Sequence, residues 1–405
     1  MVSTSAIDGL VPDLCNLRHR LHQIPEIGYK EVKTAAVVRA ELDRLGIGHT
    51  DGVAGAPTAT IALIGDAAKP CLALRADIDA LPIVEKTGLP YASTHPGFMH
   101  ACGHDGHTTM LLGTAAVLKA REQELPVCVK LLFQPAEEGG GGAEKLIAAG
   151  VLDGRLGPKV LAIFALHGWP GVPVGSVATR AGAILAATDA FIAIFTGRGC
   201  HGAYPHLGVD PIVTAAEAVV NLQQFVGREI DPIDSAVVTV GQFHGGSAFN
   251  VIPSQATIHG TARTLRPATR AAVRAAIERR CAGIADAGRC ALEFIWEQGY
   301  PATVNDPAMA RYVAEVAGRV LGADRYLPLP APSMGGEDFS YYLQQVPGCF
   351  IRVGVDPPGR TDYPSLHSDH YDFTDEALVV GVKLFVGLVE EWGTGHEKLR
   401  MRNVE

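Results

Sequence analysis

The sequence lacks features that would assign it to several other protein classes. It has no excess of basic residues, since 34 Lys and Arg stand against 43 Asp and Glu and the formal net charge is −9. A phosphate backbone or an anionic membrane surface would meet no uniform positive field, so we expect no nucleic-acid partner. None of the eight cysteines belongs to a CxxC pair. This excludes a disulfide framework and a structural zinc finger, and predicts that most cysteines are reduced core residues.

Long apolar runs are missing too. The longest uncharged stretch, residues 160–179, is interrupted by His167, by Trp169-Pro170-Gly171 and by Pro173, which favours two strands and a loop over a bilayer span. Residues 1–8 contain no basic segment followed by an apolar one, so no signal peptide is predicted. We therefore expect a cytoplasmic protein with no membrane partner.

The chain does contain ample apolar sequence, 47% of 405 residues, which is enough for two or three domains. Its middle part, residues 185–298, is predicted to be an insert of different character. Strand and helix patterns follow one another there in the order β-α-β-β-α-β, near residues 190–195, 210–226, 236–240, 255–263, 273–284 and 290–296. This order predicts a ferredoxin-like α+β domain.

The flanking segments, residues 1–184 and 299–405, share another pattern. Apolar strands near 58–64, 71–75, 127–133 and 160–166 alternate with helical stretches near 31–46 and 105–121, and the same alternation resumes after the insert. Such alternation predicts an α/β fold with helices flanking a mixed sheet. We therefore expect one discontinuous α/β domain that is interrupted by the insert.

Side chains of the metal-binding type are concentrated in residues 99–107, which contain His100, Cys102, His104 and His107. Thiolate and imidazole suit zinc and its transition-metal neighbours, and a loop that enters a helix can direct several side chains to one point. The alternative is a polar helix N-terminus with a chance excess of histidine.

Two adjacent carboxylates, Glu137 and Glu138, follow the predicted strand 127–133. The carboxyl ends of strands are where α/β sheets bind ligands, and one carboxylate there can hold a cation while the other accepts a proton from water. The alternative is a pair of solvated loop glutamates. The glycine run 139–142 lacks a Gly-Lys-Ser/Thr ending and GxGxxG spacing, which excludes a nucleotide site.

Histidines recur in two further places: His167 at the end of a predicted strand, and His367 shortly before the last predicted helix. A lone histidine in either place is usually structural. Four sequence-distant segments that each offer a zinc-type ligand, however, predict a metal site at one edge of the sheet.

Several of these motifs, in the same order, resemble a known family. The chain is similar to the M20 metallopeptidase and amidohydrolase superfamily, in the branch of hippurate hydrolases, N-acyl amino acid amidohydrolases and auxin-conjugate (IAA-amino acid) hydrolases. The resemblance rests on residues 17–26, 75–82, 102–107, 134–138, 335–339 and 366–368. It implies a metallo-exopeptidase-like catalytic domain, split by an inserted lid and dimerisation domain.

The resemblance also implies a metal site with two divalent ions per subunit, which zinc, manganese, cobalt or nickel would fit. Carried over position by position, the general base falls on Glu137 and the ligands fall on Cys102, His104, Glu138, His167 and His367. Whether Cys102 or His104 bridges the metals stays open. Most members of the superfamily have a histidine where this chain has Asp77, and we expect Asp77 and Asp79 to support the ligands.

The resemblance places further site residues on the insert. Asn250 and Arg263 are the implied partners of the substrate carboxylate, and His201 is implied to reach across a dimer interface to the substrate carbonyl, with His206 as a weaker candidate. The alternatives are a solvated strand arginine and a loop histidine at a helix end. The expected assembly is a homodimer, or a dimer of such dimers.

The expected function is hydrolysis of the amide bond of a small N-acyl amino acid, such as hippurate, by metal-activated water with Glu137 as base. A dipeptidase or an N-acetyl-amino-acid deacetylase of the same superfamily is the nearest alternative. A binding protein without catalytic activity on the same fold is an alternative from another class.

Overall fold

The computed structural model describes residues 7–360 and 362–392, and the chain divides into two compact units. Unit 1 is formed by Met1–Ile184, Val304–Ala331 and Asp338–Glu405, and unit 2 by Leu185–Thr303 and Pro332–Glu337. Residues 1–6, which carry most of the segment where no signal peptide is predicted, lie outside the described residues. Two short strands, β7 (Gly182–Leu185) and β14 (Thr303–Asn305), fall on the boundaries between the units.

Unit 1 is built on a mixed sheet, as the sequence predicts. Within the described residues this sheet has eight strands, in the order β1 (His49–Val53), β2 (Ala56–Ile64), β4 (Cys128–Gln134), β3 (Cys71–Asp77), β5 (Val160–Pro173), β16 (Gly348–Asp356), β6 (Val177–Thr179) and β15 (Tyr326–Pro328). The central strands β4, β3, β5 and β16 are mutually parallel. Strand β2 is antiparallel to β4, and β6 is antiparallel to β16.

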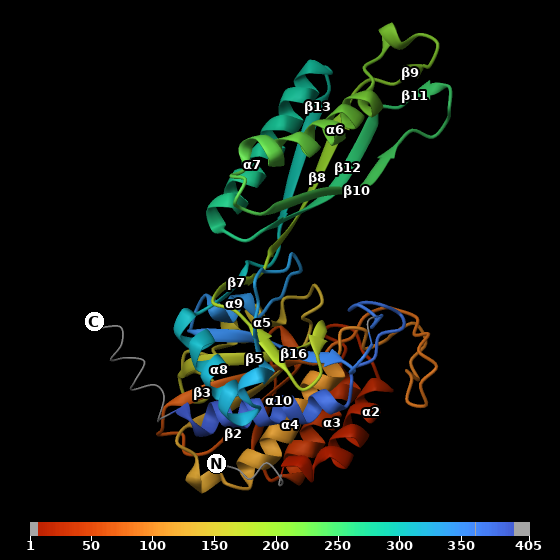
Figure 1. Ribbon diagram of the computed structural model, residues 1–405. Helices are drawn as coiled ribbons and strands as arrows, with labels where there is room; N and C mark the ends of the chain where they lie inside the picture. Colours follow the sequence, from red (N-terminus) through yellow and green to blue (C-terminus); the bar gives the residue numbers. More distant parts are fainter. Residues whose placement is uncertain (1–6, 361, 393–405) are drawn as a thin grey trace, which may run out of the picture. The chain divides into compact units, whose positions relative to one another are not determined.

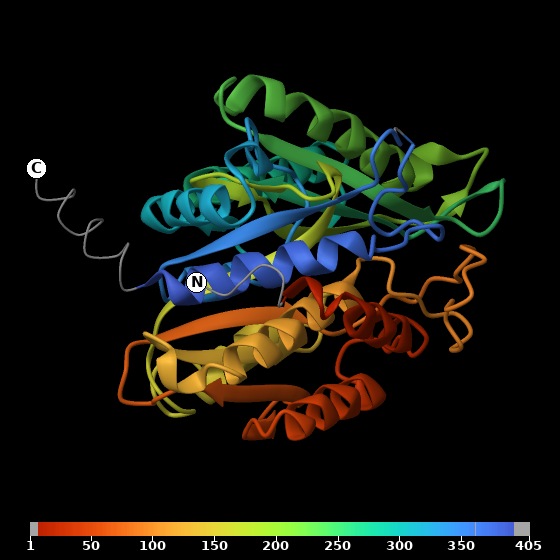
Figure 2. The same ribbon diagram turned by 60° about the horizontal axis from the view of Figure 1, so that its bottom comes forward.

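Helices cover both faces of this sheet. The face that carries the main apolar core is covered by α2 (Val11–His22), α3 (Val32–Arg44), α4 (His104–Lys119), α8 (Pro307–Val320) and α10 (Glu376–Glu390). The short helices α5 (Gly142–Ala149) and α9 (Ser340–Leu343) contact strands and one another on the other side. Figures 1 and 2 show α4 and α10 side by side. Single-turn helices η1 (Glu122–Glu124) and η3 (Ala323–Arg325) lie in connections.

The start of α4 depends on a glycine. Gly103 has a φ of 82°, in the left-handed region, and a β-carbon at this position would lie 2.9 Å from the Phe373 ring and 3.0 Å from the Tyr371 hydroxyl. Glycine adopts this backbone conformation without steric penalty. The tight approach fixes the residues on either side of Gly103, which are Cys102 and His104, at the N-terminal end of the helix.

Strand β5 is longer than the sequence predicts. It runs without interruption from Val160 to Pro173, so the expectation that the strand ends near His167 is wrong. The reason is pairing, because β16 stays in parallel register with β5 from Gly348 opposite Ile163 to Gly354 opposite Trp169. The pairing then resumes with Asp356 opposite Pro173, after a register shift that accommodates Pro170 and Gly171. His167 therefore lies within the strand.

Unit 2, all of whose residues are described, has a four-stranded antiparallel sheet in the order β10 (Ala236–Gly245), β12 (Gln255–Thr264), β8 (Ala187–Thr196) and β13 (Ala291–Gln298). Helices α6 (Pro211–Glu229) and α7 (Pro267–Ala287) pack against it through one apolar core. The element order β-α-β-β-α-β with this strand order is ferredoxin-like. Figure 1 shows both helices beside this sheet and the short pair β9 (Cys200–His201) and β11 (Val251–Ile252) at one of its ends.

Local sequence explains why α6 starts where it does. Asp210 accepts hydrogen bonds from the backbone nitrogens of Ile212 and Val213, and Pro211 takes the first helical position. An aspartate cap followed by proline is a favourable helix start. The single-turn helix η2 (Pro205–Leu207) precedes it. None of the helices in the described part of the chain combines the length and the apolar character needed to cross a bilayer.

Candidate metal centre

Acidic and imidazole side chains meet at the carboxyl ends of the parallel strands of unit 1. Asp77 is the last residue of β3, Glu137 and Glu138 follow β4, and His167 lies in the neighbouring strand β5. Parallel strands bring their carboxyl ends to one edge of a sheet. The short loops after β3 and β4 therefore deliver their carboxylates to the same place.

The N-terminal end of α4 adds His104 to this edge. Its Nδ1 atom lies 3.3 Å from Asp79 Oδ1, and its Nε2 atom lies 3.6 Å from Asp77 Oδ2. Burial lowers the pKa of His104, but the carboxylates of Asp77 and Asp79 outweigh this effect and raise it to about 10. Without a metal ion, a proton on His104 thus supplies positive charge to a strongly acidic cluster.

Cys102 and His167 face each other in the same cluster. The Sγ atom of Cys102 lies 3.5 Å from Nε2 of His167. The other ring nitrogen of His167, Nδ1, is 2.7 Å from the carbonyl oxygen of Gly168, to which it can only donate. The proton of the neutral imidazole is therefore on Nδ1, and the lone pair of Nε2 points toward the thiol. Burial lowers the pKa of His167 well below its ordinary value, which keeps the ring neutral.

His367 enters the cluster from a loop. Its Nε2 atom lies 3.1 Å from Glu138 Oε1, and its backbone nitrogen donates a hydrogen bond to the carbonyl oxygen of Ala101 at 2.8 Å. The backbone of His367 is left-handed, with a φ of 65°, and its side chain is 52% exposed. Left-handed backbone is uncommon outside glycine and costs about 1–3 kcal/mol.

His107 also lies close to the cluster but its ring nitrogens are already used. Its Nδ1 atom is 2.6 Å from Asp77 Oδ1, and its Nε2 atom accepts a hydrogen bond from the backbone nitrogen of Gly168 at 2.7 Å. His107 therefore orients Asp77 and is not available as a ligand. The sequence motif contains His107, but nothing in the sequence distinguishes it from His104.

A cluster that binds a metal ion should contain buried polar atoms that make no hydrogen bond within the protein. Among the described residues, the buried atoms Asp79 Oδ1, Glu138 Oε1 and both ring nitrogens of His104 make no hydrogen bond, although His104 faces Asp79 and His367 faces Glu138 at ion-pair distance. One ligand atom from each of Cys102, Glu138 and His367 lies within 4.8 Å of the others, and the same holds for His104, Glu137 and Glu138. Buried polar groups are rarely left without partners. The first set offers S, O and N donors and the second offers N and O donors, which fit divalent transition metals.

Glu137 is held apart from Glu138 by a separate set of contacts. Its Oε1 atom accepts a hydrogen bond from the backbone nitrogen of Asp338 at 3.3 Å. Asp338 is itself fixed through its carboxylate by Arg75 Nη2 at 2.9 Å and by Gln134 Nε2 at 2.8 Å. Arg75 also donates to Asp77 at 2.6 Å, so one buried guanidinium links the loops after β3 and β4 to the segment that starts α9.

The loop that carries the two glutamates is supported by the segment before α3. Glu31 Oε1 accepts a hydrogen bond from the backbone nitrogen of Ala136 at 2.9 Å, and the Tyr29 hydroxyl donates to the carbonyl oxygen of Gly140 at 2.6 Å. Ala136 has a left-handed backbone with a φ of 56°. Burial raises the pKa of Glu31 to about 7. Sequence reasoning missed both supporting residues.

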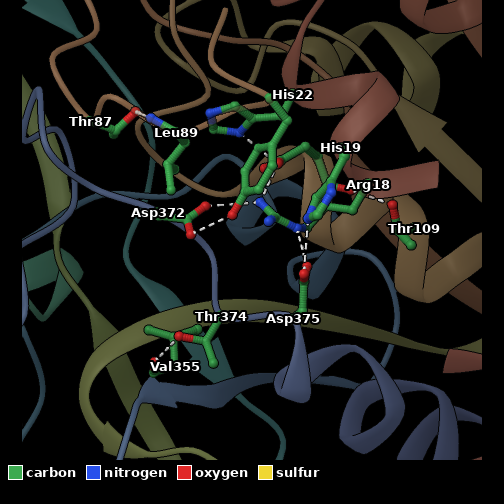
Figure 3. A network of polar contacts seen from close by, with 12 residues as sticks. Arg18, His19, His22, Thr87, Leu89, Thr109, Val355, Asp372, Thr374 and Asp375 are labelled. Carbon is green, nitrogen blue, oxygen red and sulfur yellow. Dashed lines mark hydrogen bonds and ion pairs between the residues drawn. The ribbon is translucent and has the colours of Figure 1, made fainter. Parts of the chain in front are cut away.

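A second buried network lies behind the N-terminal end of α4. Arg18, on α2, forms ion pairs with Asp105 at 3.2 Å and Asp372 at 3.0 Å, and also contacts Asp375. Asp105 Oδ2 lies 2.8 Å from His22 Nδ1. Figure 3 shows Asp372 and Asp375 directed toward Arg18. Because Asp105 follows His104, this network anchors the helix end that presents the cluster.

The residues predicted on the insert all belong to unit 2. His201 and Asn250 are neighbours there, because His201 pairs with Val251 and the Gly202 nitrogen donates to the Asn250 carbonyl oxygen at 2.7 Å. The Ala203 nitrogen donates to His201 Nδ1 at 3.0 Å, which leaves Nε2 as the protonated nitrogen. His206 is exposed and its ring lies 6.4 Å from that of Tyr204.

Arg263 lies far from that pair within unit 2. On β12, Arg263 is paired with Thr188 of β8. At the other end of β12, Gln255 is paired with Thr196 of β8 and lies close to β9. Eight residues of extended strand span roughly 27 Å. The Arg263 guanidinium donates to Thr261 and, at 3.1 Å, to the carbonyl oxygen of Ala262. One copy of unit 2 therefore does not bring Arg263 together with Asn250.

Comparison with known families decides the relationship. A family model described as peptidase family M20/M25/M40 matches residues 73–391. The chain belongs to this family. The resemblance identified from the motifs is thereby confirmed, as is the α/β fold with a mixed sheet.

Several named proteins match along nearly the whole chain. IAA-amino acid hydrolase ILR1-like 4 of Arabidopsis thaliana is 42% identical over 94% of this chain and 85% of its own length. N-acetyl-L-cysteine deacetylase of Bacillus subtilis is 42% identical over 93% of this chain and 87% of its own length. The crystal structure of the Bacillus subtilis YXEP protein, described as a dinuclear metal binding peptidase, matches with a TM-score of 0.81 and 36% identity over 94% of this chain and 98% of that one.

Proposed function

We propose that this protein is a metal-dependent amidohydrolase that cleaves the amide bond of small N-acyl amino acids. The observation that carries the proposal is the convergence of buried donor atoms without hydrogen-bond partners at the edge of the unit 1 sheet, beside a separately held carboxylate, Glu137. The names of the plant and bacterial relatives, an IAA-amino acid hydrolase and an N-acetyl-L-cysteine deacetylase, support the substrate class.

The proposed ligands of two divalent ions are the residues that the family resemblance implies, Cys102, His104, Glu138, His167 and His367. The Bacillus subtilis YXEP protein, which is described as dinuclear, supports the number of ions. The mixed S, N and O donors would accept zinc, manganese, cobalt or nickel. When bound, the ions polarise the scissile carbonyl and lower the pKa of a water molecule. Asp79 fixes the Glu138 backbone through a hydrogen bond at 3.0 Å, and Asp77 and Asp79 flank His104.

Glu137 is proposed to move the proton. It accepts a proton from the attacking water on its carboxylate and returns this proton to the nitrogen of the leaving amino acid. The Asp338 amide restrains Oε1, and the carboxylate is buried, so it reaches water only within the site. Glu138 is unsuited to this role because its Oε1 atom faces His367.

The substrate-binding roles on unit 2 are proposals as well. His201 Nε2–H would donate to the developing oxyanion, His206 would assist as a weaker candidate, and Asn250 and Arg263 would bind the carboxylate. Asn250 precedes β11, which pairs with β9 beyond the Gln255 end of β12, whereas Arg263 lies near the other end of β12. We therefore propose that the two residues serve a given substrate from different subunits. This requires a homodimer in which unit 2 also acts as a lid, and a dimer of dimers is the larger form. We place the dimer in the cytoplasm.

The nearest competing function is deacetylation of N-acetyl amino acids, which the bacterial relative favours through its name. It uses the same chemistry with a smaller acyl pocket. A dipeptidase would bind a free amino group where the amidohydrolase binds an acyl group. These three functions therefore differ in the group that precedes the scissile carbonyl.

The test is a substrate panel with added Zn²⁺, Mn²⁺, Co²⁺ or Ni²⁺. Benzoyl, acetyl and indole-acetyl derivatives of one amino acid are compared with a dipeptide of that amino acid, and Glu137→Gln serves as the inactive control. Turnover of acyl amino acids above the dipeptide is expected. Turnover of the dipeptide alone, or of no compound at full metal occupancy, contradicts the proposal.

A further inference from the structure

Besides Arg18, which forms ion pairs, two arginines in the described part of unit 1 have buried guanidinium nitrogens without a hydrogen-bond partner: the half-buried Arg180 and the buried Arg352. Among the described residues, the Lys and Arg side chains buried in the fold are Arg18, Arg75, Lys130 and Arg352. Arg18 and Arg75 form ion pairs with aspartates, and Lys130 Nζ donates to the carbonyl oxygens of Val151, Leu156 and Pro158 at 2.6–2.8 Å. By contrast, the buried Nε and Nη2 atoms of Arg352 have no hydrogen-bond partner in the described part of the chain.

Arg352 is close to the metal centre within the same unit. It lies on β16 directly opposite His167 on β5. Its guanidinium carbon is 3.8 Å from the centre of the Trp169 ring, and the Trp169 ring is 5.4 Å from the ring of His167. Trp169 thus connects the guanidinium to a proposed ligand. The arginine lies at the margin of the same site, and apart from this stacking its Nε and Nη2 atoms have no partner among the described residues.

The charge on Arg352 is not compensated by its surroundings. The side chain is 7% exposed, and burial lowers its pKa to about 10, so it stays protonated at neutral pH. A cation over an indole ring gains about 2 kcal/mol when desolvated. The effective penalty for taking an ion out of water is several kcal/mol. The stacked ring therefore offsets part of the penalty, and an anion is needed for the rest.

We propose that Arg352, stacked on Trp169, binds a carboxylate of the substrate beside the metal centre. A planar guanidinium suits a carboxylate because it can donate two parallel hydrogen bonds. The inference rests on the proposed function. Since Asn250 and Arg263 are proposed to bind the α-carboxylate, Arg352 is assigned to a second carboxylate, on the acyl group or on the amino-acid side chain. The preferred substrates would then be dicarboxylic.

The kinetic test uses Arg352→Met with pairs of substrates that differ by one carboxylate. N-succinyl-alanine against N-acetyl-alanine tests the acyl group, N-acetyl-aspartate against N-acetyl-asparagine tests the side chain, and N-acetyl-alanine against its amide tests the α-carboxylate. A hydrogen-bonded charge pair predicts that the variant loses 10- to 100-fold more kcat/KM for the acidic member of the first or second pair than for its neutral partner. Equal losses for both members of every pair overturn the proposal, and a loss confined to the third pair reassigns the α-carboxylate and contradicts it as stated.

A binding test separates this inference from the proposed function, because it needs no turnover. Succinate and neutral succinamide are titrated calorimetrically into the wild type, Arg352→Met, Arg352→Lys and the control Arg319→Met, which removes an exposed arginine paired with Glu391. Succinate is expected to bind the wild type and the control, to bind Arg352→Lys more weakly and not to bind Arg352→Met. Equal binding to all four variants contradicts the proposal.

The change of Tm in Arg352→Met is a further test, because its sign differs between an arginine kept for ligand binding and an arginine that pairs with a carboxylate of the protein. If Arg352 is an uncompensated cation kept for binding, Arg352→Met raises Tm without ligand and abolishes the rise of Tm that succinate produces in the wild type. If a carboxylate of the protein pairs with Arg352, the same variant lowers Tm because it strands that carboxylate. A lowered Tm with unchanged succinate response overturns the proposal.

Discussion

Asp79 holds Glu138 in place by its backbone: the Oδ2 atom of Asp79 accepts a hydrogen bond from the Glu138 nitrogen at 3.0 Å. The remaining oxygen of this carboxylate lies 3.3 Å from a ring nitrogen of His104. A single buried aspartate therefore sets the position of the loop after β4 relative to the start of α4. Residues from both segments are proposed ligands, so their spacing does not depend on the metal alone.

Replacing the proposed base separates catalysis from metal binding. Glu137→Gln is expected to keep its metal content and to lose about 10²- to 10⁴-fold in kcat, because the amide cannot accept the proton of the attacking water. Metal content is measured by elemental analysis and kcat by product formation. The exposed Glu144→Gln on α5 is the control. Near-normal turnover at full metal occupancy would show that Glu137 is not the base.

Cys102 is expected to behave as a metal-shielded thiolate. Burial, followed by the carboxylates of Glu138 and Glu137, raises the pKa of this thiol well above its ordinary value in the metal-free protein, so a cation is required to ionise it. Cys102→Ala should lower the bound metal per chain, whereas Cys281→Ala, which removes a buried cysteine of unit 2, should not. Unchanged stoichiometry and affinity in Cys102→Ala would make this residue an ordinary buried thiol.

Arg18 is expected to contribute strongly to stability. Arg18→Met leaves the carboxylate of Asp105 buried with His22 as its remaining ion-pair partner, and losing one member of a buried pair costs about 3–5 kcal/mol. The free energy of unfolding is measured by urea titration. Arg44→Met, which removes an exposed pair with Glu41, should change it by less than about 1 kcal/mol. Similar losses in the two variants would contradict the role of the buried network.

Glu31 should make the protein less stable as the pH rises. Its pKa in the folded state is about 7, above the ordinary value of 4.5, because of burial. The folded state therefore holds the proton more tightly, and this contribution is complete below pH 4.5 and is lost as the pH rises through 7. At about 1.4 kcal/mol per pKa unit, the loss is on the order of 3 kcal/mol.

Glu31→Gln isolates this effect. In the wild type, Ala136 N and the Thr58 hydroxyl donate to the Glu31 carboxylate. In the variant, the amide oxygen can accept from Ala136, and the amide nitrogen can donate to the Thr58 hydroxyl, which then acts as acceptor. Relative to Glu31→Gln, the wild type should lose stability between pH 4.5 and pH 8, as measured by urea unfolding at each pH. In the control Glu315→Gln, which changes an exposed glutamate, the free energy of unfolding should depend on pH as it does in the wild type. A constant difference between the wild type and Glu31→Gln across this range would show that Glu31 is already ionised.

If His201 acts across the dimer interface, as the family resemblance implies, mixing two inactive variants should recover activity. Glu137→Gln and His201→Ala homodimers that exchange subunits form heterodimers with one intact site. Recovery that approaches one active site per heterodimer is expected. Confirmed subunit exchange without recovery would exclude the trans arrangement, and full activity of His201→Ala would exclude any catalytic role.

The residues alone predict a metal site at this edge of the sheet, and the family resemblance implies its ligands, because both rest on short motifs of unusual chemistry. Cys102 and His104 lie within three residues of each other, and Glu138 follows a clear apolar strand. The supporting contacts could not be derived in this way. Asp338 is 263 residues away from Arg75, its partner, and the amide that binds His107 comes from Gly168, 61 residues later. Distances of this kind depend on strand order, which a single sequence does not encode locally.

One signal for the missing contacts was nevertheless visible. Arg75, Lys130 and Arg352 each interrupt an otherwise apolar strand, at positions that the pairing of the sheet buries. A charge in such a place requires a compensating group. The sequence therefore indicates that each of these three cations needs a partner, but it does not identify the residue or ligand that serves as the partner. The length of β5 was missed for a related reason, because the register of β16 extends that strand past its proline and glycine.

The left-handed backbone of His367 puts selection for stability and selection for activity in conflict. Glycine or asparagine would adopt a φ of 65° at a lower conformational cost, and the half-exposed side chain buries little apolar surface that would be lost. A library of this protein screened for thermal resistance alone should therefore enrich substitutions at position 367. The survivors of that screen would be robust proteins from which a proposed metal ligand has been removed, so any directed evolution of this chain has to select for turnover at every round.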